Sequence, residues 1–402
     1  MSGHERPDAT SELLMRNYGP TSVCFVEGHG SWLVDAEGRR YLDLLSGLAV
    51  TSLGHSHPEV AAALAHQANT LLHVSNLFAN DQNGPLAATI DGLLGGGGQI
   101  FFANSGAEAN ECAIKLARKF GGRGRHTVVS AYGSFHGRTL ATLHATGQPA
   151  KHEAFQPMPE GFRHVAWCDL EAMDAALDGS VAGVLLEPIQ GEGGVNPATV
   201  EYFAGVRSLC DERGALFIVD EIQTGLGRTG RWFGHEHFGI RPDVVTLAKA
   251  LGNGVPIGAC WARRDVASVF EPGDHGSTYG GQPLAAAGAR AVLEVMRRED
   301  VPARAERAGA ALRAGLGDRS DVAEIRGLGL LLGIELIDID AKAVAAELLV
   351  RGIVVNAVTP TAIRLAPSLL ITDDEIALAV DGINAALDTF SASVAAGTGS
   401  AS

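Results

Sequence analysis

Cysteine is scarce in this chain: only five of its 402 residues are cysteines, and no two of them form a C-x-x-C pair. A scattered, odd-numbered set argues against a disulfide framework and against a zinc site of the cysteine type. Long apolar runs are also missing, since none approaches the roughly 20 residues that a membrane-spanning helix needs. The polar first residues lack the pattern of a secretory signal, so we expect a cytoplasmic protein that does not enter a membrane.

Basic residues are outnumbered by acidic ones, 31 to 46, which gives a formal net charge of −15. A chain with this excess of negative charge repels the phosphate backbone of nucleic acids, so we expect no nucleic-acid partner. Apolar residues make up 46% of the sequence, which is enough for a sizeable core and excludes extended disorder. Glycine is abundant, with 51 residues and no collagen-like period, which indicates many tight turns and close backbone approaches.

Short apolar runs alternate with helical patterns through the middle of the chain. We expect strands at residues 100–103, 127–130, 182–186, 216–219, 244–247 and 257–261, because mostly unbroken apolar runs are typical of strands covered on both faces. Helical patterns follow Ser105 and occupy residues 199–212. This alternation predicts an α/β fold with a mostly parallel central sheet.

The two ends of the sequence show a different pattern. Residues 31–45 fit a hairpin, 283–315 a pair of long helices, and 322–390 strands that alternate with helices. We therefore expect a large domain at 51–285 and a smaller α+β domain at 286–390, to which the N-terminal segment 1–50 largely belongs. The small and polar residues 391–402 are expected to form a disordered tail.

Several familiar motifs are absent or misplaced. The sequence contains no G-x-x-x-x-G-K-[ST] and no G-x-S-x-G. Residues 225–230, GLGRTG, fit the G-x-G-x-x-G of dinucleotide-binding proteins, but an insert separates them from the preceding strand and no apolar helix follows. An NAD-dependent oxidoreductase is therefore a weak alternative. The two histidine pairs, at 55/57 and 235/237, lack further ligands, so no metal site is expected.

Three chemically useful groups fall at the ends of predicted strands. Ser105 would begin a helix, whose N-terminus is a ready anion site, although Ser105 and Glu108 also fit an ordinary capping box. Asp220 would end a buried strand, where it could serve a structural ion pair or a protonated heterocyclic nitrogen. Lys249 would follow another strand, where burial lowers the pKa and suits Schiff-base chemistry, unless the side chain reaches the surface. Because ligands bind at strand ends in open α/β sheets, a phosphorylated pyridine aldehyde would use all three groups.

The sequence resembles the class III aminotransferases of fold type I, which bind pyridoxal 5'-phosphate (PLP). The resemblance covers about residues 17–390, and its main stretches are FFANSGAEANECAIKLARK, SFHGRTLATLHATGQPAK, LFIVDEIQTGLGRTG, PDVVTLAKALGNGVPIGA and HGSTYGGQPLAAA. Within the class, the FHGRT motif makes it most similar to the acetylornithine aminotransferases. The resemblance implies a ping-pong transfer of an amino group from N2-acetylornithine to 2-oxoglutarate, a reaction of arginine biosynthesis that yields N-acetylglutamate 5-semialdehyde and glutamate.

The resemblance also implies roles for individual residues at the cofactor. Lys249 would bind PLP covalently and shuttle the proton, and Asp220 would hold the pyridine nitrogen protonated. The other contacts would come from Ser105, Gly106 and Ala107 at the phosphate, Phe135 on the ring face, Gln223 at the phenolic oxygen, and Thr278 at the phosphate of the partner subunit.

Four residues would bind the substrates. Arg138 would hold the α-carboxylate of the amino donor, and Arg364 a carboxylate of 2-oxoglutarate. Glu192 would pair with Arg364 when no such carboxylate is bound, and Ser277 would lie beside acetylornithine. The contact across subunits implies a homodimer with shared active sites. Ornithine δ-aminotransferase, an aminotransferase of succinyldiaminopimelate or another ω-amino acid, and a non-catalytic PLP-binding protein are the alternatives.

Overall fold

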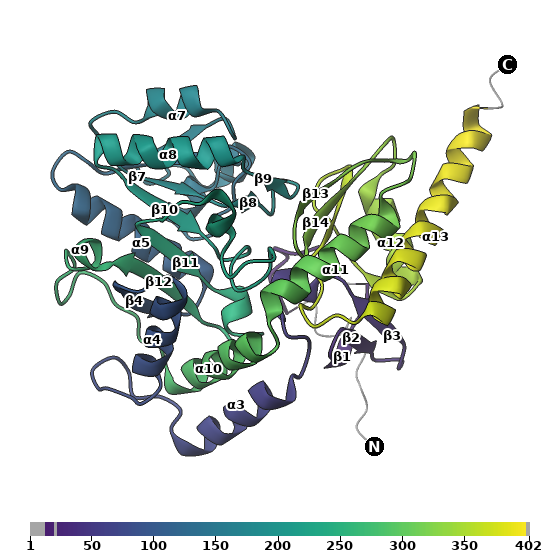
Figure 1. Ribbon diagram of the computed structural model, residues 1–402, viewed down its shortest axis with the longest axis horizontal. Helices are drawn as coiled ribbons and strands as arrows, with labels where there is room; N and C mark the ends of the chain where they lie inside the picture. The colour runs from purple at the N-terminus through teal and green to yellow at the C-terminus, as the bar shows by residue number, and fades with distance from the viewer. Residues whose placement is uncertain (1–12, 20–21, 399–402) are drawn as a thin grey trace.

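The computed structural model describes residues 13–19 and 22–398 of the chain. Figure 1 shows two regions side by side, one built on a large sheet and the other on smaller sheets. Helices α10 (Pro283–Arg298) and α11 (Val301–Leu316) lead from the first region into the second. The domain boundaries expected from the sequence stay predictions. Helix α13 (Asp373–Thr398) overlaps the segment 391–402 for which a disordered tail is expected, and residues 399–402 lie outside the described part.

The larger region contains a seven-stranded sheet. In order across the sheet, its strands are β4 (Gly98–Ala103), β12 (Gly258–Arg263), β11 (Val244–Leu247), β10 (Leu216–Asp220), β7 (Val181–Leu186), β5 (Thr127–Ala131) and β6 (Phe162–Val165). Neighbouring strands are parallel except at β12, which is antiparallel to both β4 and β11. The predicted α/β fold with a mostly parallel central sheet is confirmed.

The burial of these strands explains their sequences. Strands β5, β7, β10 and β11 are buried along their whole length, as is typical of strands that helices cover on both faces. The apolar runs do not predict strand β6, because its sequence FRHV mixes polar with apolar residues. It lies at the edge of the sheet, where one side of the strand has no neighbour and charged side chains are tolerated.

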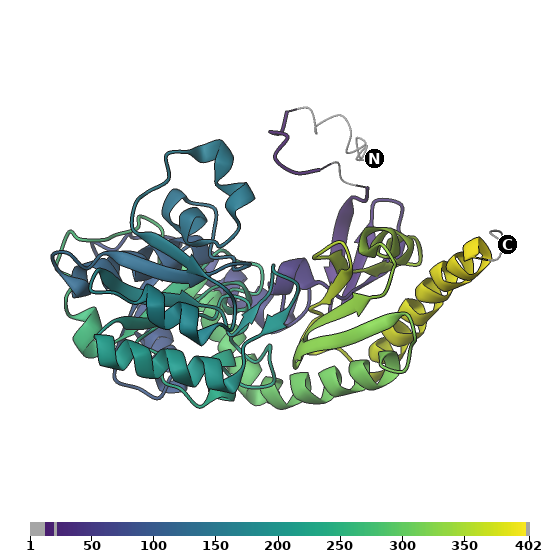
Figure 2. The same ribbon diagram turned by 90° about the horizontal axis from the view of Figure 1, so that it is seen from above.

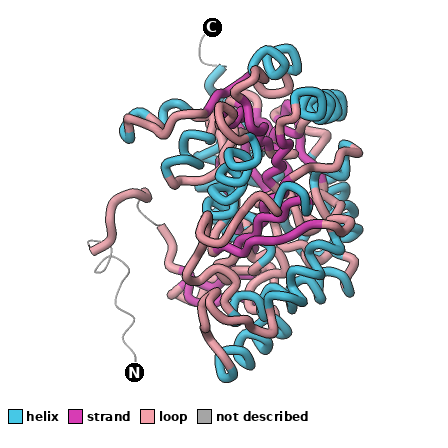
Figure 3. The backbone as a smooth tube through the Cα atoms, turned by 90° about the vertical axis from the view of Figure 1, so that its left-hand side faces the viewer, coloured by secondary structure: helices cyan, strands magenta, loops and turns pink. Residues whose placement is uncertain are grey.

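Helices cover both faces of this sheet, as Figure 3 shows. Helix α5 (Gly106–Gly121) packs on one face through a buried stripe against β7, β11 and β12. The opposite face is covered in two parts, by α7 (Leu170–Ala176) with α8 (Val200–Arg213), and by α3 (Pro58–Thr70), α4 (Asn83–Leu93) and α10. The remaining short helices of this region are α6 (Leu140–Ala145) and α9 (Arg264–Ala267).

The smaller region contains two four-stranded sheets (Figure 2). The first has the order β1 (Phe25–His29), β2 (Trp32–Asp35), β3 (Arg40–Asp43) and β15 (Ile353–Val354). The second has the order β13 (Val322–Leu328), β14 (Leu331–Leu336), β17 (Ala362–Leu365) and β16 (Asn356–Ala357). Because β3 pairs with β15, segments from both ends of the chain share one sheet. Helices α11, α12 (Ala341–Val350) and α13 pack beside these strands.

Two further segments lie where the regions meet. One is the left-handed turn labelled α2 (Ser46–Ala49), and the other is a short hairpin of β8 (Ile189–Gln190) and β9 (Asn196–Pro197). Strands β4, β5, β7, β10 and β11 point in the same direction, since β12 is antiparallel to both β4 and β11. Their carboxyl ends therefore meet at one edge of the sheet, the usual ligand-binding edge of open α/β folds.

No helix among residues 13–19 and 22–398 has the length and apolar character that would let it cross a membrane.

Candidate active site

A cavity of about 450 Å³ opens at the carboxyl edge of the seven-stranded sheet. Val50, which directly follows α2, contributes to its wall, and the segment after Lys249 contributes residues 254–257. The cavity brings together nine of the residues selected from the sequence, which are Ser105, Gly106, Ala107, Phe135, Arg138, Glu192, Asp220, Gln223 and Lys249. Groups far apart along the chain therefore share one small volume.

Lys249 reaches this cavity from the end of β11. It follows Ala248 and begins a short 3-10 turn, Lys249–Leu251, with a φ of +45°. A non-glycine residue in this backbone region is strained, and such residues cluster at functional sites. Burial lowers the pKa of the Lys249 ammonium to about 8, although the negative charge of Glu192 opposes the shift. Near neutral pH, the fraction of Lys249 that is a neutral amine is therefore much larger than in an ordinary lysine. The neutral amine is the nucleophilic form.

Asp220 ends β10 and is only 4% exposed. Its Oδ2 atom accepts hydrogen bonds from Asn110 Nδ2 and from His136 Nδ1, both at 2.8 Å. Its Oδ1 atom accepts a hydrogen bond from the backbone N–H of Ile222 at 3.1 Å. Burial of a carboxylate is costly unless such donors satisfy it. The three donors fix the carboxylate in one orientation at the wall of the cavity.

The sequence does not predict the two side chains that hold Asp220. Asn110 is buried on α5, where its Oδ1 accepts a hydrogen bond from Thr246 Oγ1 at 2.8 Å and its Nδ2 also donates to the carbonyl oxygen of His136 at 2.8 Å. His136 is 2% exposed and directly follows Phe135. One signal for Asn110 is present in the sequence, because an amide on the apolar side of a helix requires a polar partner.

Glu187 also lines the cavity, and the sequence does not single it out. It directly follows β7, and its Oε2 accepts a hydrogen bond from the backbone N–H of Phe135 at 3.1 Å. Burial raises the pKa of Glu187 well above its usual value, and the negative charge of Asp220 adds to the effect. Two carboxyl groups in one cavity resist being ionised together, so the environment of Glu187 favours its protonated form over the carboxylate.

The N-terminus of α5 faces the same cavity. Ser105 caps this helix, because its Oγ accepts a hydrogen bond from the backbone N–H of Glu108 at 3.2 Å. A methyl group on Gly106 would lie 2.7 Å from Cδ1 of Ile222, so glycine allows the close approach of these two segments. The first N–H groups of a helix lack partners within the helix, and the helix dipole is positive at this end. The capping box and an anion site therefore coexist here, and the site suits a phosphate group.

Arg364, on β17 in the smaller region, does not line the cavity itself but contacts Glu192 and Gln223, which do. It is 1% exposed, and its Nη1 donates hydrogen bonds to Glu192 Oε1 at 2.5 Å and to Gln223 Oε1 at 3.3 Å. Its Nη2 donates to Asn356 Oδ1 at 2.9 Å. Burial alone would raise the pKa of Glu192, but the charge and the hydrogen bond of Arg364 outweigh it, so this pKa is lowered. Glu192 is therefore an ionised carboxylate that neutralises a buried guanidinium.

Arg138 is exposed and lines the cavity beside Phe135. The Cζ atom of Arg138 and the Nζ atom of Lys151 each lie 5.5 Å from the centroid of the Phe135 ring. Burial lowers the pKa of Lys151, and the positive charge of Arg138 adds to the shift. No ion pair between described residues involves Arg138. Its guanidinium is thus available to a carboxylate from a bound molecule.

Ser277 and Thr278 do not line the cavity within one chain. Ser277 lies next to its wall, because Ser277 Oγ accepts a hydrogen bond from Asn104 Nδ2 at 3.1 Å and Asn104 lines the cavity. Thr278 is exposed. The roles expected of both residues involve a substrate or a second subunit, and they stay predictions.

Residues 225–230, which match a dinucleotide-binding pattern, form turns around a buried arginine. Arg228 is 1% exposed and donates hydrogen bonds to the carbonyl oxygens of Leu330 at 3.1 Å and Pro367 at 2.6 Å. Burial lowers the pKa of Arg228 to about 9. The glycines lead into further turns and a 3-10 helix, Gly234–Phe238, instead of an α-helix. Without a helix N-terminus the segment cannot bind a pyrophosphate in the manner of that motif.

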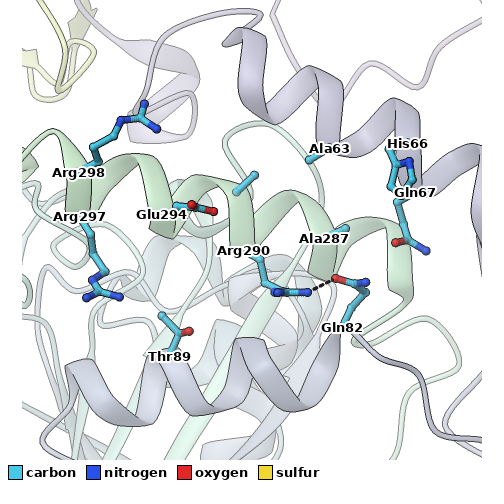
Figure 4. Close-up of a pocket in the computed structure, with 11 residues that line it drawn as sticks. Ala63, His66, Gln67, Gln82, Thr89, Ala287, Arg290, Glu294, Arg297 and Arg298 are labelled. Carbon is cyan, nitrogen blue, oxygen red and sulfur yellow. Dashed lines mark hydrogen bonds between the residues drawn. The ribbon is translucent and has the colours of Figure 1, made fainter.

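A second hollow, of about 790 Å³, lies between α3, α4 and α10. Figure 4 shows the side chains that line it, among them Arg290, Glu294, Arg297 and Arg298 of α10. Arg290 is engaged by Gln82, since its Nη1 donates to Gln82 Oε1 at 2.6 Å. None of the residues selected from the sequence lines this hollow. Within the described ranges, no group of three or more histidine, cysteine and acidic side chains is placed to hold a metal ion.

Comparisons with known proteins agree with the chemistry of the first cavity. The family described as Aminotransferase class-III matches residues 13–387. The acetylornithine aminotransferase of Gloeobacter violaceus is 47% identical over 391 residues, which are 94% of this chain and 97% of that protein. The acetylornithine aminotransferase of Mycobacterium tuberculosis is 47% identical over 379 residues, 93% of each chain.

Solved structures share the fold. The ornithine aminotransferase of Toxoplasma gondii is 37% identical with a TM-score of 0.91, and the match covers 96% of this chain and 94% of that one. The N-acetylornithine aminotransferase of Stenotrophomonas maltophilia is 38% identical with a TM-score of 0.82, and the match covers 93% of this chain and 98% of that one. Because the family match and these relatives span nearly the whole sequence, the chain belongs to the class-III aminotransferases.

Proposed function

We propose that this protein is a PLP-dependent aminotransferase that moves the terminal amino group of N2-acetylornithine to 2-oxoglutarate. The observation that carries the proposal is that Lys249, Asp220 and the N-terminus of α5 converge on one cavity, in a chain 47% identical to acetylornithine aminotransferases. The products are N-acetylglutamate 5-semialdehyde and glutamate, as in arginine biosynthesis. Both substrates use the same cavity in turn, which makes the kinetics ping-pong.

The residues of the cavity fit the parts of PLP. Lys249 would bind its aldehyde carbon, Asp220 its pyridine nitrogen, and the N-terminus of α5 its phosphate. Phe135 offers a ring face, and Gln223 an amide for the phenolic oxygen. When bound, PLP supplies an electron sink that stabilises negative charge on the carbon bearing the transferred amino group.

The protein supplies proton transfer and fixed charge. Lys249 Nζ, with its pKa lowered to about 8, is poised to accept a proton from the substrate carbon and later return one. Asp220 places a negative charge where the protonated pyridine nitrogen would lie, and Asn110 and His136 keep that carboxylate from turning away.

The charged groups at the edge of the cavity account for two different substrates. Arg138 would bind the α-carboxylate of acetylornithine through two parallel hydrogen bonds. Glu192 neutralises Arg364 while this amino donor is bound. A carboxylate of 2-oxoglutarate would then take the place of Glu192 at Arg364, so that one cavity accepts a monocarboxylate and a dicarboxylate in turn.

The substrate assignment predicts that kcat/KM for acetylornithine exceeds that for ornithine by at least about tenfold, or 1.4 kcal/mol. Free ornithine carries a second ammonium on its α-carbon, which would lie beside the cationic groups of Arg138 and Lys151, whereas the acetyl group removes this charge. A side-by-side assay of both amines with 2-oxoglutarate measures the ratio. Equal or better use of ornithine would instead assign the activity named for the Toxoplasma gondii relative.

Arg138→Lys tests the proposed carboxylate contact in the same assay. An ammonium cannot reproduce the two parallel hydrogen bonds of a guanidinium, so the variant should lose roughly 2–5 kcal/mol of transition-state binding with acetylornithine. The loss should be much smaller with γ-aminobutyrate, which has no carboxylate in the α position next to an acylated amine. Equal losses on both amines would show that Arg138 does not hold the α-carboxylate.

We also propose a homodimer with shared active sites. Leu77 and Phe78 are 86% and 71% exposed, and Tyr279 is 59% exposed. Asn76 Nδ2 donates hydrogen bonds to the carbonyl oxygens of Ser277 at 3.0 Å and of Gly280 at 2.9 Å. These contacts join the exposed apolar segment to the one that contains Thr278. Exposed apolar side chains gathered in this way are typical of a protein–protein contact.

The homodimer predicts that the active protein sediments at twice the 41.8 kDa of one chain. Phe78→Asp should dissociate it and weaken cofactor retention, because Thr278 would then be lost from the neighbouring phosphate site. Leu378→Asp is the matched control, since Leu378 is also exposed, at 51%, but lies on α13. A fully active monomer in sedimentation would defeat the shared-site proposal.

We place the enzyme in the cytoplasm, with small-molecule substrates and no nucleic-acid or membrane partner. The five cysteines are free in the structure, which suits a reducing compartment. The net charge of −15 disfavours binding to anionic polymers and anionic membrane surfaces.

A further inference from the structure

Glu192 lies in a strained loop, residues 191–195, between β8 and β9. Gly194 has a φ of +115° and Val195 a φ of +60°. A β-branched residue is a clear outlier in this left-handed region. Val195 is also fully buried. Such a backbone persists only where its surroundings hold it, so the loop depends on what lies beneath it.

Beneath the loop, three residues form one row across the sheet of β13, β14, β17 and β16. Arg326 on β13 is opposite Gly333 on β14, and Gly333 is opposite Arg364 on β17. Directly opposite residues of antiparallel strands project from the same face. The two arginines therefore stand on one face of the sheet, with a residue that has no side chain between them.

The loop rests on this gap. A methyl group on Gly333 would lie 2.9 Å from Cβ of Val195 and 3.0 Å from the carbonyl oxygen of Gly194. Figure 1 shows the hairpin of β8 and β9 beside β13 and β14. Glycine at position 333 thus lets the loop lie directly on the sheet.

The two arginines form hydrogen bonds with opposite ends of the loop. Arg364 Nη1 donates to Glu192 Oε1 at 2.5 Å and to the carbonyl oxygen of Gly191 at 3.2 Å. Arg326 Nε donates to the carbonyl oxygen of Gly194 at 2.8 Å, and its Nη2 donates to Glu335 Oε2 at 2.7 Å. Of these two guanidinium groups, only that of Arg364 must also receive a substrate carboxylate.

We propose that Arg326 is a positioning residue for the exchange at Arg364. It keeps the backbone of the loop docked on the sheet while the side chain of Glu192 alone leaves Arg364 and returns. This inference rests on the proposed function, because the exchange itself is part of it. Arg326 can perform this role in both half-reactions, since none of its partners takes part in the exchange. Without it, once Glu192 leaves, Arg364 would hold the loop only through its hydrogen bond to the carbonyl oxygen of Gly191, and the end at Gly194 would lose its arginine donor.

The proposal predicts an asymmetric defect. Acetylornithine needs Glu192 in place over Arg364, whereas a carboxylate of 2-oxoglutarate replaces Glu192. Arg326→Met keeps the apolar stem and removes the donors. It should lower kcat/KM of the acetylornithine half-reaction about tenfold, the order expected for one lost hydrogen bond from a charged donor. The 2-oxoglutarate half-reaction should stay within about twofold, because it does not need the carboxylate that the loop carries.

Two more variants sharpen the test. Arg319→Met is the matched control, because Arg319 pairs with Asp321 and Asp388 and not with residues 191–195 of the loop. It should leave both half-reactions unchanged. Gly333→Ala disturbs the same loop without removing a hydrogen-bond donor, because the added methyl group would crowd Val195. It should reproduce the asymmetry although Arg326 is intact.

Single-turnover absorbance measures each half-reaction of the holoenzyme separately, and hydrogen exchange of the peptide covering residues 189–197 measures how firmly the loop is held. We expect faster exchange in this peptide for Arg326→Met and Gly333→Ala but not for Arg319→Met. Equal losses in both half-reactions, or unchanged exchange in Arg326→Met, would overturn the proposal. A wild-type enzyme that does not use acetylornithine would contradict the proposed function, while the exchange measurement would still report whether Arg326 holds the loop.

Discussion

Lys249→Ala is expected to abolish turnover while the protein still folds. The variant loses the amine that would bind the cofactor covalently and also the group that moves the proton. General acid–base catalysis alone contributes about 10²–10⁴-fold, so we expect a loss of about 10⁴-fold or more in kcat. The fold should survive, because burial of the Lys249 ammonium is unfavourable, as its lowered pKa shows. Circular dichroism and thermal unfolding check the fold, and an assay with acetylornithine and 2-oxoglutarate checks turnover.

Lys342→Ala is the matched control for this experiment. Lys342 is an exposed lysine near the start of α12, so its loss should leave kcat within about twofold, as is usual for surface substitutions away from special features. If Lys249→Ala retained more than a few per cent of wild-type turnover, another group would have to bind the cofactor and move the proton.

Asp220→Asn is expected to lower kcat by roughly 10²–10³-fold, the range seen when one charge-stabilising group is removed from an active site. The amide has no negative charge to keep the pyridine nitrogen protonated, so the ring would withdraw electrons less strongly. The amide oxygen can still accept the hydrogen bonds from Asn110 and His136, whereas its NH2 group faces the backbone N–H of Ile222 without an acceptor. PLP should still bind, because its phosphate and aldehyde contacts are intact.

Absorbance of the bound cofactor and steady-state kinetics test this variant together. Asp211→Asn is a control, since Asp211 is an exposed residue on α8 whose ion pair is with Arg207, away from the cavity. Near-normal turnover by Asp220→Asn, with cofactor bound, would remove Asp220 from its proposed role.

The sequence predicts the parts of this site that depend on local pattern. The apolar runs that end at Asp220 and just before Lys249 are recognisable as buried strands, and parallel strands in one sheet must end at the same edge. The N-terminus of α5 is also readable from Ser105 and Glu108, because capping has a short-range signature. These three local features suffice to suggest a phosphorylated cofactor at one edge of the sheet.

The remaining parts depend on how distant segments meet, which no local pattern encodes. The orientation of β12, antiparallel to its two neighbours, follows from the path of the chain around the sheet and not from the sequence of the strand. Asn110 and His136 matter because they meet at Asp220, more than 80 positions away from either in the chain. The row of Arg326, Gly333 and Arg364 exists only once the register of three strands is set.

The central claim, that Lys249 carries the cofactor of an aminotransferase, is tested most directly by borohydride reduction of the purified protein followed by peptide mapping. Borohydride reduces a linkage between PLP and a lysine and so makes it permanent. The structure predicts loss of the yellow absorbance and one pyridoxyl group per chain, on the peptide that contains Lys249. A pyridoxyl group on any other lysine, or no bound PLP at all in the active protein, would contradict the account.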